Sequence, residues 1–268
     1  MSITDSALAI EAAQAGAEVV RSQYGSSLAR VQKTGGDFAT SADVEAEKAI
    51  LDVVRTARPH DVVVAEESGR TGTAGNGRTW LVDPLCGTLN YAVQSMLTSV
   101  NVGLRTGTHV AVAASADPFT REVFWTDGSA AHVRRDGRDE RLAPSAESRL
   151  VDVNLDPPFP HRNVFLAARM LADDGFIEQF RPRVVSTTLA VAWVAAGRRA
   201  AYVTDGHHLG DSVHFAAGIA LCEAAGCVVT GIDGQPIRAG GNGLVVAADE
   251  RTHAALLTLI RQQRTGRD

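Results

Sequence analysis

The sequence predicts a mixed α/β (α+β) protein whose two halves differ in architecture. Residues 99–135 hold four short β-rich runs separated by turn signals, which indicates an antiparallel meander. From about residue 150, strands and helices alternate, which favours a more parallel α/β arrangement. A chain of 268 residues suits one large domain or two smaller units that share a core. We expect the boundary in "APSAES", with an N-terminal α+β half over residues 1–146 and a C-terminal α/β half over residues 147–268.

Two helices and two strands precede the meander. Residues 4–24 repeat apolar side chains at helical spacing, on the face of Leu8, Ala12, Ala15 and Val19. A second helix is predicted over residues 41–57, because Thr40 and Asp43 form a T-x-x-D start signal and Pro59 follows its end. Short strands are expected in "DVVVAEES" and "TWLVD". Between them, the Gly- and Thr-rich "GRTGTAGNGR" is typical of a flexible loop.

The second half alternates between strand-like and helix-like segments. Strands are expected in "LVDVNLD", "AAYVT", "CVVT" and "GLVVAA". Helices are expected in "NVFLAARMLADDG", "TTLAVAWVAAG", "SVHFAAGIALCEAAG" and "ERTHAALLTLIRQQ". Gly197 and Gly226 close two of these helices.

Net charge and cysteine content argue against several classes of protein. The chain carries 31 acidic and 26 basic residues, a net charge of -5, which disfavours a general nucleic-acid binder. Its three cysteines lack C-x-x-C spacing, which disfavours a disulfide framework or a structural zinc site and favours a reducing compartment. With no signal-peptide pattern and no run of about 18 apolar residues, we expect a cytoplasmic protein that does not span a membrane.

Acidic side chains end two strands of the predicted first half. Glu66 and Glu67 follow one strand and Asp83 follows the next, so their oxygens can meet at one sheet edge, as a Mg²⁺ site requires. The alternative is that these acids are simply solvated. The turn "LCGTLN" favours the metal site, because Gly87 permits close approach of an anion and Thr88 offers a hydroxyl at a helix start. An anion site beside metal ligands indicates phosphate chemistry.

Several segments resemble the inositol monophosphatase family of Mg²⁺-dependent, lithium-sensitive phosphatases. "AEES" and "WLVDPLCGTLNYA" are similar to the family patterns G-E-E and W-x-x-D-P-[IL]-D-G-T-x-N-[FY]. "GDSVHFAAGIALCEAAGCVV" is similar to W-D-x-A-A-G-x-x-[IL]-x-x-E-A-G-G, and "KTGGDFATSADVEAEKAI" and "LAVAWVAAGRRAAYV" resemble two further family segments. The resemblance covers nearly the whole chain in order. It implies a layered α/β/α/β/α sandwich.

The resemblance also implies the ligands of two metal ions. Glu66 would bind the first metal and orient the attacking water. Asp83 would bridge the two metals, and the carbonyl of Leu85 would complete the ligands of the first. Asp211 would hold the second metal and contact the substrate.

A proton-transfer pair and a phosphate site follow from the same resemblance. Asp43 and Thr88 would take up the proton of the attacking water. The backbone amides around Cys86, Gly87 and Thr88 would bind the phosphate. Lys33 matches a loop lysine that lies near the metals in the family.

Four positions depart from the family pattern. Cys86 stands where the family has an aspartate ligand of the second metal. Because thiolates suit softer metals than Mg²⁺, we expect the second metal to bind more weakly. The local sequence places no histidine to activate Cys86, which disfavours it as a nucleophile. Gly210, Val185 and Ala200 replace a Trp, a Gly and an Asp of the pattern, which indicates an altered substrate pocket or weakened catalysis.

Three histidines lie close to Asp211 in the sequence. His207 and His208 occupy a segment where the family places substrate-contacting side chains. They either bind substrate hydroxyls or a second phosphate, or form an exposed loop pair. His214 is expected on a helix, in a structural role.

The sequence thus predicts a Mg²⁺-dependent phosphoric monoester hydrolase in which metal-activated water attacks a small phosphate. An inositol phosphate, a sugar phosphate or a 3′-phosphonucleotide would be the substrate, and Cys86 would reduce the activity or alter its metal. The alternative is a phosphate-ligand binding protein of the same fold with impaired catalysis. The resemblance implies a homodimer, with neither a nucleic-acid polymer nor a membrane as partner.

Overall fold

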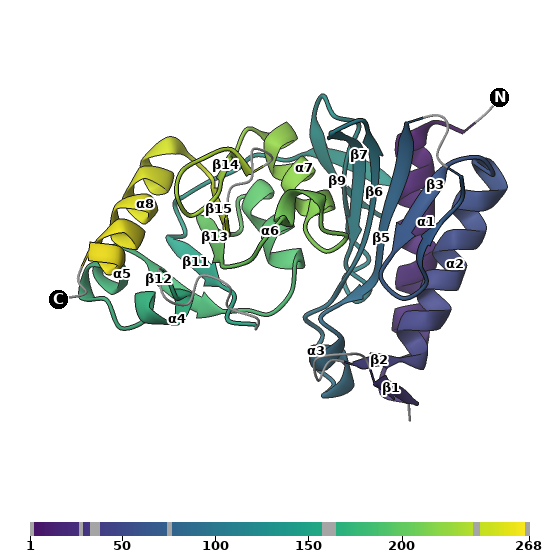
Figure 1. Ribbon diagram of the computed structural model, residues 1–268, viewed down its shortest axis with the longest axis horizontal. Coiled ribbons are helices and arrows are strands. Elements are labelled where there is room, and N and C mark those ends of the chain that lie inside the picture. The colour runs from purple at the N-terminus through teal and green to yellow at the C-terminus, as the bar shows by residue number, and fades with distance from the viewer. Residues whose placement is uncertain are drawn as a thin grey trace.

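The protein is built from five alternating layers of helices and sheets (Figure 1). The structure, a computed structural model, describes residues 3–26, 29–32, 38–73, 77–156, 165–237 and 242–265. Lys33 lies outside these residues. The succession of helices, sheet, helices, sheet and helices confirms the α/β/α/β/α sandwich that the sequence predicts.

The larger sheet contains eight strands: β3 (Val62–Ala65), β4 (Gly69–Thr71), β5 (Arg78–Cys86), β6 (Ser99–Thr106), β7 (His109–Ala116), β8 (Val123–Thr126), β9 (Ala131–Arg135) and β10 (Arg138–Arg141). Their order is β10-β9-β8-β7-β6-β5-β3-β4, and only β3 and β5 run parallel. The run from β6 to β9 is the predicted meander. A separate pair, β1 (Arg30–Gln32) and β2 (Phe38–Thr40), precedes this sheet.

Helices α1 (Asp5–Gln23) and α2 (Ser41–Ala57) cover the outer face of the larger sheet (Figure 1). Their apolar faces pack on buried strand residues that include Trp80 and Val100. The two helices approach closely at Gly16, where an added Cβ would lie 2.7 Å from Cδ1 of Ile50. Helix α2 begins as predicted, because Thr40 and Asp43 form a capping box.

The smaller sheet contains five strands: β11 (Leu150–Val153), β12 (Arg181–Val184), β13 (Ala201–Thr204), β14 (Val228–Thr230) and β15 (Leu244–Ala247). Their order is β12-β11-β13-β15-β14. Only the pairs of β11 with β12 and β13 are parallel, so the sheet is mixed. Helices α4 (Ala167–Met170), α5 (Asp174–Gln179) and α8 (Glu250–Thr265) pack on its outer face.

Helices α6 (Leu189–Ala195) and α7 (Ala216–Ala225) form the layer between the two sheets. Ala216, Ala217 and Ala220 of α7 pack against the larger sheet. Ile219 and Leu221 join the core that includes strands of the smaller sheet. Because α7 packs in both cores, the two halves of the chain share their central layer. The boundary between residues 146 and 147 stays a prediction.

Some local expectations differ from the structure. The segment expected to be a flexible loop contains β4, which pairs with β3. Where one helix was expected over 163–175, the described part forms the short helices α4 and α5. Strand β12 was not expected, since its sequence "RPRV" is mostly exposed and contains a proline. Among the described residues, no helix combines the length and apolar character needed to cross a bilayer.

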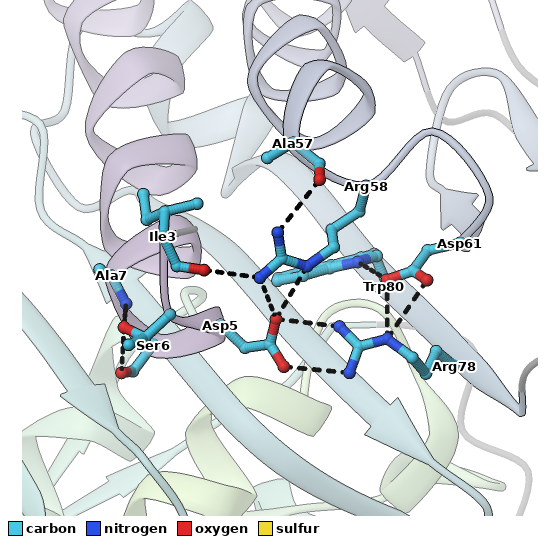
Figure 2. Close-up of polar contacts among 10 residues, drawn as sticks. Ile3, Asp5, Ser6, Ala7, Ala57, Arg58, Asp61, Arg78 and Trp80 are labelled. Atoms are coloured by element: carbon cyan, nitrogen blue, oxygen red, sulfur yellow. Dashed lines mark hydrogen bonds and ion pairs between the residues drawn. The ribbon is translucent and has the colours of Figure 1, made fainter. Parts of the chain in front are cut away.

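A polar network ties the start of α1 to the start of β5 (Figure 2). Asp5 accepts hydrogen bonds from Arg58 at 2.8 Å and from Arg78 at 2.9 Å. Arg78 and the Trp80 indole also donate to Asp61, at 3.0 and 2.9 Å. Although partial burial alone would raise the pKa of Asp5, the hydrogen bonds from the two arginines bring that pKa below its usual value. The network therefore holds the far end of β5 against both helices.

Candidate active site

The end of β5 places two expected site residues on the same side of the sheet. Asp83 lies opposite Asn101 of β6 and Cys86 lies opposite Ser99, so β5 has one extra residue in this interval. Side chains three positions apart in a regular strand point to opposite faces, but a β-bulge reverses that alternation. The Asp83 carboxylate and the Cys86 thiol accordingly converge, with ligand atoms within 4.8 Å of each other.

Asp83 is fully buried and interacts through both carboxylate oxygens. Its Oδ1 accepts a hydrogen bond from the Leu85 backbone N–H at 3.2 Å. Its Oδ2 lies 2.8 Å from Nδ1 of His214. The His214 side chain is 41% exposed, so one face of this contact is open to solvent. Asp83, Cys86 and His214 each contribute one potential metal ligand, and all three atoms lie within 4.8 Å of one another.

Glu66 follows β3 and lies at the edge of this group. Its Oε2 is 3.9 Å from Nδ1 of His214. The backbone beyond it is held by the buried Glu47 of α2, whose carboxylate accepts from the N–H groups of Glu67 at 2.7 Å and Ser68 at 2.9 Å. Glu47 thus fixes the turn that presents Glu66 to the site.

Asp43 and Thr88 are paired, as the resemblance implies. The Thr88 hydroxyl lies 3.0 Å from Oδ1 of Asp43 and 3.2 Å from the Leu85 carbonyl oxygen. Asp43 is fully buried, and its Oδ2 accepts from the backbone N–H of Thr40 at 2.7 Å. The carboxylate therefore caps α2 with one oxygen and meets the threonine hydroxyl with the other.

Gly87 makes the turn between β5 and the single-turn helix α3 (Thr88–Ala92). Its φ of 96° lies in the left-handed region, and an added Cβ would lie 2.8 Å from the carbonyl oxygen of Leu97. The expected helix start is present, but α3 has only five residues, so its dipole is weak. Any phosphate bound here would rest on the turn amides and the Thr88 hydroxyl rather than on a long helix.

Cys86 contacts a buried polar cluster formed by Thr188, Asn101 and Ser115. Its Sγ accepts a hydrogen bond from the Thr188 backbone N–H at 3.4 Å. The Thr188 hydroxyl in turn accepts from Asn101 at 2.9 Å, and Asn101 accepts from Ser115 at 2.8 Å. Burial raises the pKa of the Cys86 thiol well above its usual value, and the negative charge of Asp83 raises it further. This raised pKa favours the protonated thiol at neutral pH.

Asp211 occupies a different environment from the one expected. It lies in the short 3₁₀ helix η1 (Leu209–Asp211), its side chain is 68% exposed, and its Oδ1 accepts from Arg105 at 3.0 Å. Arg105 pairs with Thr79, four residues before Asp83 and about 13 Å away along β5. In the structure it is His214, not Asp211, that contacts Asp83.

The family pattern itself accounts for this correction. Ala216, Ala217 and Gly218 match the A-A-G of W-D-x-A-A-G, and counting back from them places the aspartate position at His214. The Trp position then falls on Val213 and not on Gly210. His214 was expected on a helix in a structural role, yet it lies in the turn before α7. The count back from A-A-G was the signal that could have found it.

The remaining residues that the sequence singled out lie outside the group of Asp83, Cys86 and His214. His207 and His208 are exposed, and His207 Nδ1 lies 3.2 Å from Oδ1 of Asn242. Whether they contact substrate stays a prediction. Val185 and Ala200 are buried side chains of the core.

The donor atoms suit Mg²⁺ at only one of the two metal positions that the resemblance implies. Glu66, Asp83 and the Leu85 carbonyl supply hard oxygen atoms, which fit Mg²⁺ at the first position. At the second, the group offers one carboxylate together with a thiol sulfur and an imidazole nitrogen. Mg²⁺ does not favour such ligands, so the second position does not fit it.

Comparison with known proteins places the chain in a family. The family model described as the inositol monophosphatase family matches residues 4–265. The chain belongs to the inositol monophosphatase family. An inositol-1-monophosphatase of Caulobacter vibrioides is 28% identical over 262 residues, covering 94% of this chain and 99% of that protein. The Nus factor SuhB of Salmonella typhimurium is 30% identical over 267 residues, covering 96% of this chain and 95% of that protein.

Solved structures of the inositol monophosphatase type share the fold. The inositol monophosphatase of Anabaena superposes with a TM-score of 0.74 at 26% identity, covering 95% of this chain and 94% of that one. The extragenic suppressor protein SuhB of Bartonella henselae superposes with a TM-score of 0.83 at 24% identity, covering 95% and 97%. Membership of this phosphatase family supports a hydrolase.

Proposed function

We propose that the protein hydrolyses a small phosphate monoester with metal-activated water. The observation that carries this proposal is the contact of the Thr88 hydroxyl with the buried Asp43 carboxylate, at 3.0 Å, in the turn that follows the strand of Asp83. A hydroxyl that donates to a buried carboxylate can accept a proton from water and pass its own proton on. Glu66, whose Oε2 lies 3.9 Å from Nδ1 of His214, would orient that water.

The turn after β5 would receive the phosphate. Gly87 has no side chain, and its left-handed conformation forms the turn that carries the backbone amides of residues 86–88. Glu66, Asp83 and the Leu85 carbonyl would hold Mg²⁺ at the first position, where the ion would polarise water and offset phosphate charge. Asp83 would also orient His214 through its second oxygen. His214 takes the place that we first expected for Asp211.

Family membership and the chemistry of the site support the proposed substrate class. An inositol phosphate, a sugar phosphate or a 3′-phosphonucleotide would suit the predicted chemistry, and the Caulobacter relative is named an inositol-1-monophosphatase. We further propose a cytoplasmic homodimer with neither a nucleic-acid polymer nor a membrane as partner. The net charge of -5 supports the exclusion of general nucleic-acid binding.

A second candidate is a phosphate-ligand binding protein with impaired catalysis. It is favoured by the replacement of two carboxylate positions by Cys86 and His214. Relatives named Nus factor SuhB agree with a role other than catalysis.

The test is a phosphate-release screen over inositol phosphates, sugar phosphates and nucleotides, each with Mg²⁺, Mn²⁺ and Zn²⁺. Catalysis predicts release from at least one class that disappears in Asp83→Asn. Saturable binding of a phosphate ester with no release under any metal would instead favour the second candidate.

A further inference from the structure

The group formed by Asp83, Cys86 and His214, which we call the mixed-donor cluster, combines three kinds of ligand atom. A carboxylate oxygen, a thiol sulfur and an imidazole nitrogen lie within 4.8 Å of one another. Zinc sites bind such atoms at about 2.0–2.3 Å, which places tetrahedral ligands about 3.3–3.7 Å apart. Side-chain shifts of about 1 Å would therefore bring the cluster to the geometry of a zinc site.

The scaffold holds the three side chains before any metal binds. Asp83 and Cys86 flank the β-bulge of β5, and Cys86 accepts from the Thr188 N–H. His214 is positioned by its own backbone N–H, which lies 3.3 Å from the Ser212 hydroxyl. Since little rearrangement is needed, a metal that favours these donors would meet a largely formed site.

The open side of the cluster leaves room for a fourth ligand. The Asp83 side chain is fully buried, whereas His214 is 41% exposed, so the cluster opens to solvent on the histidine side. Zinc sites with three protein ligands keep the fourth position for water or substrate. Glu66, with an oxygen 3.9 Å from the imidazole, lies at the same edge and could orient that fourth ligand.

We propose that Asp83, Cys86 and His214 form a three-ligand site for Zn²⁺ at the position where the family pattern places its second, all-carboxylate metal site. Sulfur and imidazole ligands favour Zn²⁺ strongly over Mg²⁺. Zn²⁺ binding releases the thiol proton to solvent. In the metal-free cluster Nδ1 of His214 donates a hydrogen bond to the Asp83 carboxylate, so binding also requires the neutral imidazole to carry its proton on Nε2 and to exchange this hydrogen bond for the metal. The proposal concerns metal binding alone, so it stands or falls independently of the phosphatase activity proposed above.

The test measures metal binding to the full chain without substrate. After removal of bound metal with a chelator, calorimetric titration should show Zn²⁺ binding on the order of 100-fold or more tightly than Mg²⁺. Titration with Co²⁺, a spectroscopic substitute for Zn²⁺, should give a near-ultraviolet thiolate-to-metal charge-transfer band. That band reports a sulfur ligand directly and does not depend on turnover.

Variants assign the sulfur and the nitrogen. The charge-transfer band should disappear in Cys86→Ser and persist in Cys227→Ser, which alters the other partly exposed cysteine. Zn²⁺ affinity should fall at least about 10-fold in His214→Ala and stay unchanged in His207→Ala, which alters an exposed histidine outside the cluster. Thermal unfolding checks that each variant is folded. Should Cys86→Ser fail to fold, Cys86→Asp serves the same purpose with the residue of the family pattern.

The double variant Cys86→Asp/His214→Asp gives the reverse test. Its three carboxylates should lower the preference for Zn²⁺ over Mg²⁺ by at least about 10-fold and abolish the Co²⁺ band. Zn²⁺ that binds no more tightly than Mg²⁺ to the native chain would overturn the proposal. So would a Co²⁺ band that survives the loss of Cys86. In either case His214 would remain simply a hydrogen-bond partner of Asp83.

Discussion

On the side of the site formed by α2 and the end of β3, which we call the matched side, the side chains match the family pattern. Asp43 meets Thr88, and Glu47 fixes the turn that carries Glu66. On the side that faces α7, Cys86 and His214 stand where the pattern has aspartates. Asp83 lies between them and contacts the α7 side through His214.

The two sides of the site therefore differ in their tasks. One would handle the attacking water and its proton, and the other would hold the second metal. The matched side keeps the groups that would orient water and receive its proton. The side that faces α7, which we call the altered side, has a thiol and an imidazole in place of two of the pattern's carboxylates. This replacement lowers the negative charge of the site and changes the metal that it prefers. Substitutions on the two sides should therefore have different signatures, one in turnover and the other in metal dependence.

The largest effect is expected where the two sides meet. Asp83→Asn should lower phosphate release by more than about 100-fold, because the amide replaces the carboxylate that would be shared by both metal positions. Steady-state phosphate release measures this, with thermal unfolding as the control for folding. Turnover close to that of the native protein would remove Asp83 from the mechanism.

A slightly smaller effect is expected within the matched side. Thr88→Val should lower kcat by about 100-fold, because the hydroxyl that contacts Asp43 is lost while the backbone turn remains. Thr88→Ser is the matched control and should retain most of the activity. Asp43→Asn is a less clean test, since Asp43 also caps α2. Equal losses in the Val and Ser variants would show that Thr88 acts through packing.

On the altered side, the effect should appear in metal dependence. Cys86→Asp should lower the Mg²⁺ concentration needed for half-maximal activity by about 5- to 150-fold, or about 1–3 kcal/mol, because a hard carboxylate replaces a thiol. A Mg²⁺ titration of both proteins under identical conditions measures the change. If Cys86→Asp requires as much Mg²⁺ as the native chain, or loses activity that the native chain has, Cys86 has a role of its own.

The matched side was predictable from the sequence because its signals are local. The T-x-x-D pattern marked the start of α2, and the strand–turn pattern pointed to Asp83, Gly87 and Thr88, whereas the site role of Asp43 came from the family resemblance. The five-layer fold followed from family resemblance. Residues of the described α7 segment Ala216–Cys222 are all buried, as expected for a helix enclosed between two sheets.

On the altered side the sequence held the signal for His214, because counting back from A-A-G places it at the aspartate position, but it did not show the contact with Asp83. His214 lies 131 positions from Asp83 along the chain. Asp211 looked like the better ligand because of its chemistry, but the structure pairs it with Arg105. A search for carboxylate ligands alone also misses a histidine that stands in an aspartate position. Strand β12 was missed for a simpler reason, since an exposed "RPRV" segment has little strand character of its own.

The smallest effect is expected far from both sides, at the network of Figure 2. Asp5→Asn should lower the free energy of unfolding by about 1–2 kcal/mol at pH 7, because the carboxylate accepts charge-assisted hydrogen bonds from two arginines. The pKa of Asp5 is lower in the folded protein than its ordinary value of 3.8, so its stabilisation is complete above that value. It is lost as the pH falls through the folded pKa. Urea unfolding should therefore show a difference in unfolding free energy between native and variant proteins that is constant from pH 7 to about 5 and shrinks toward pH 3.

Arg78, the partner of Asp5, lies five residues before Asp83, about 17 Å along β5, so phosphate release at pH 7 should not change. If Asp5→Asn lost activity but not stability, the start of β5 would affect catalysis at its other end. Substitutions on the two sides of the site could then not be interpreted without the rest of the sheet.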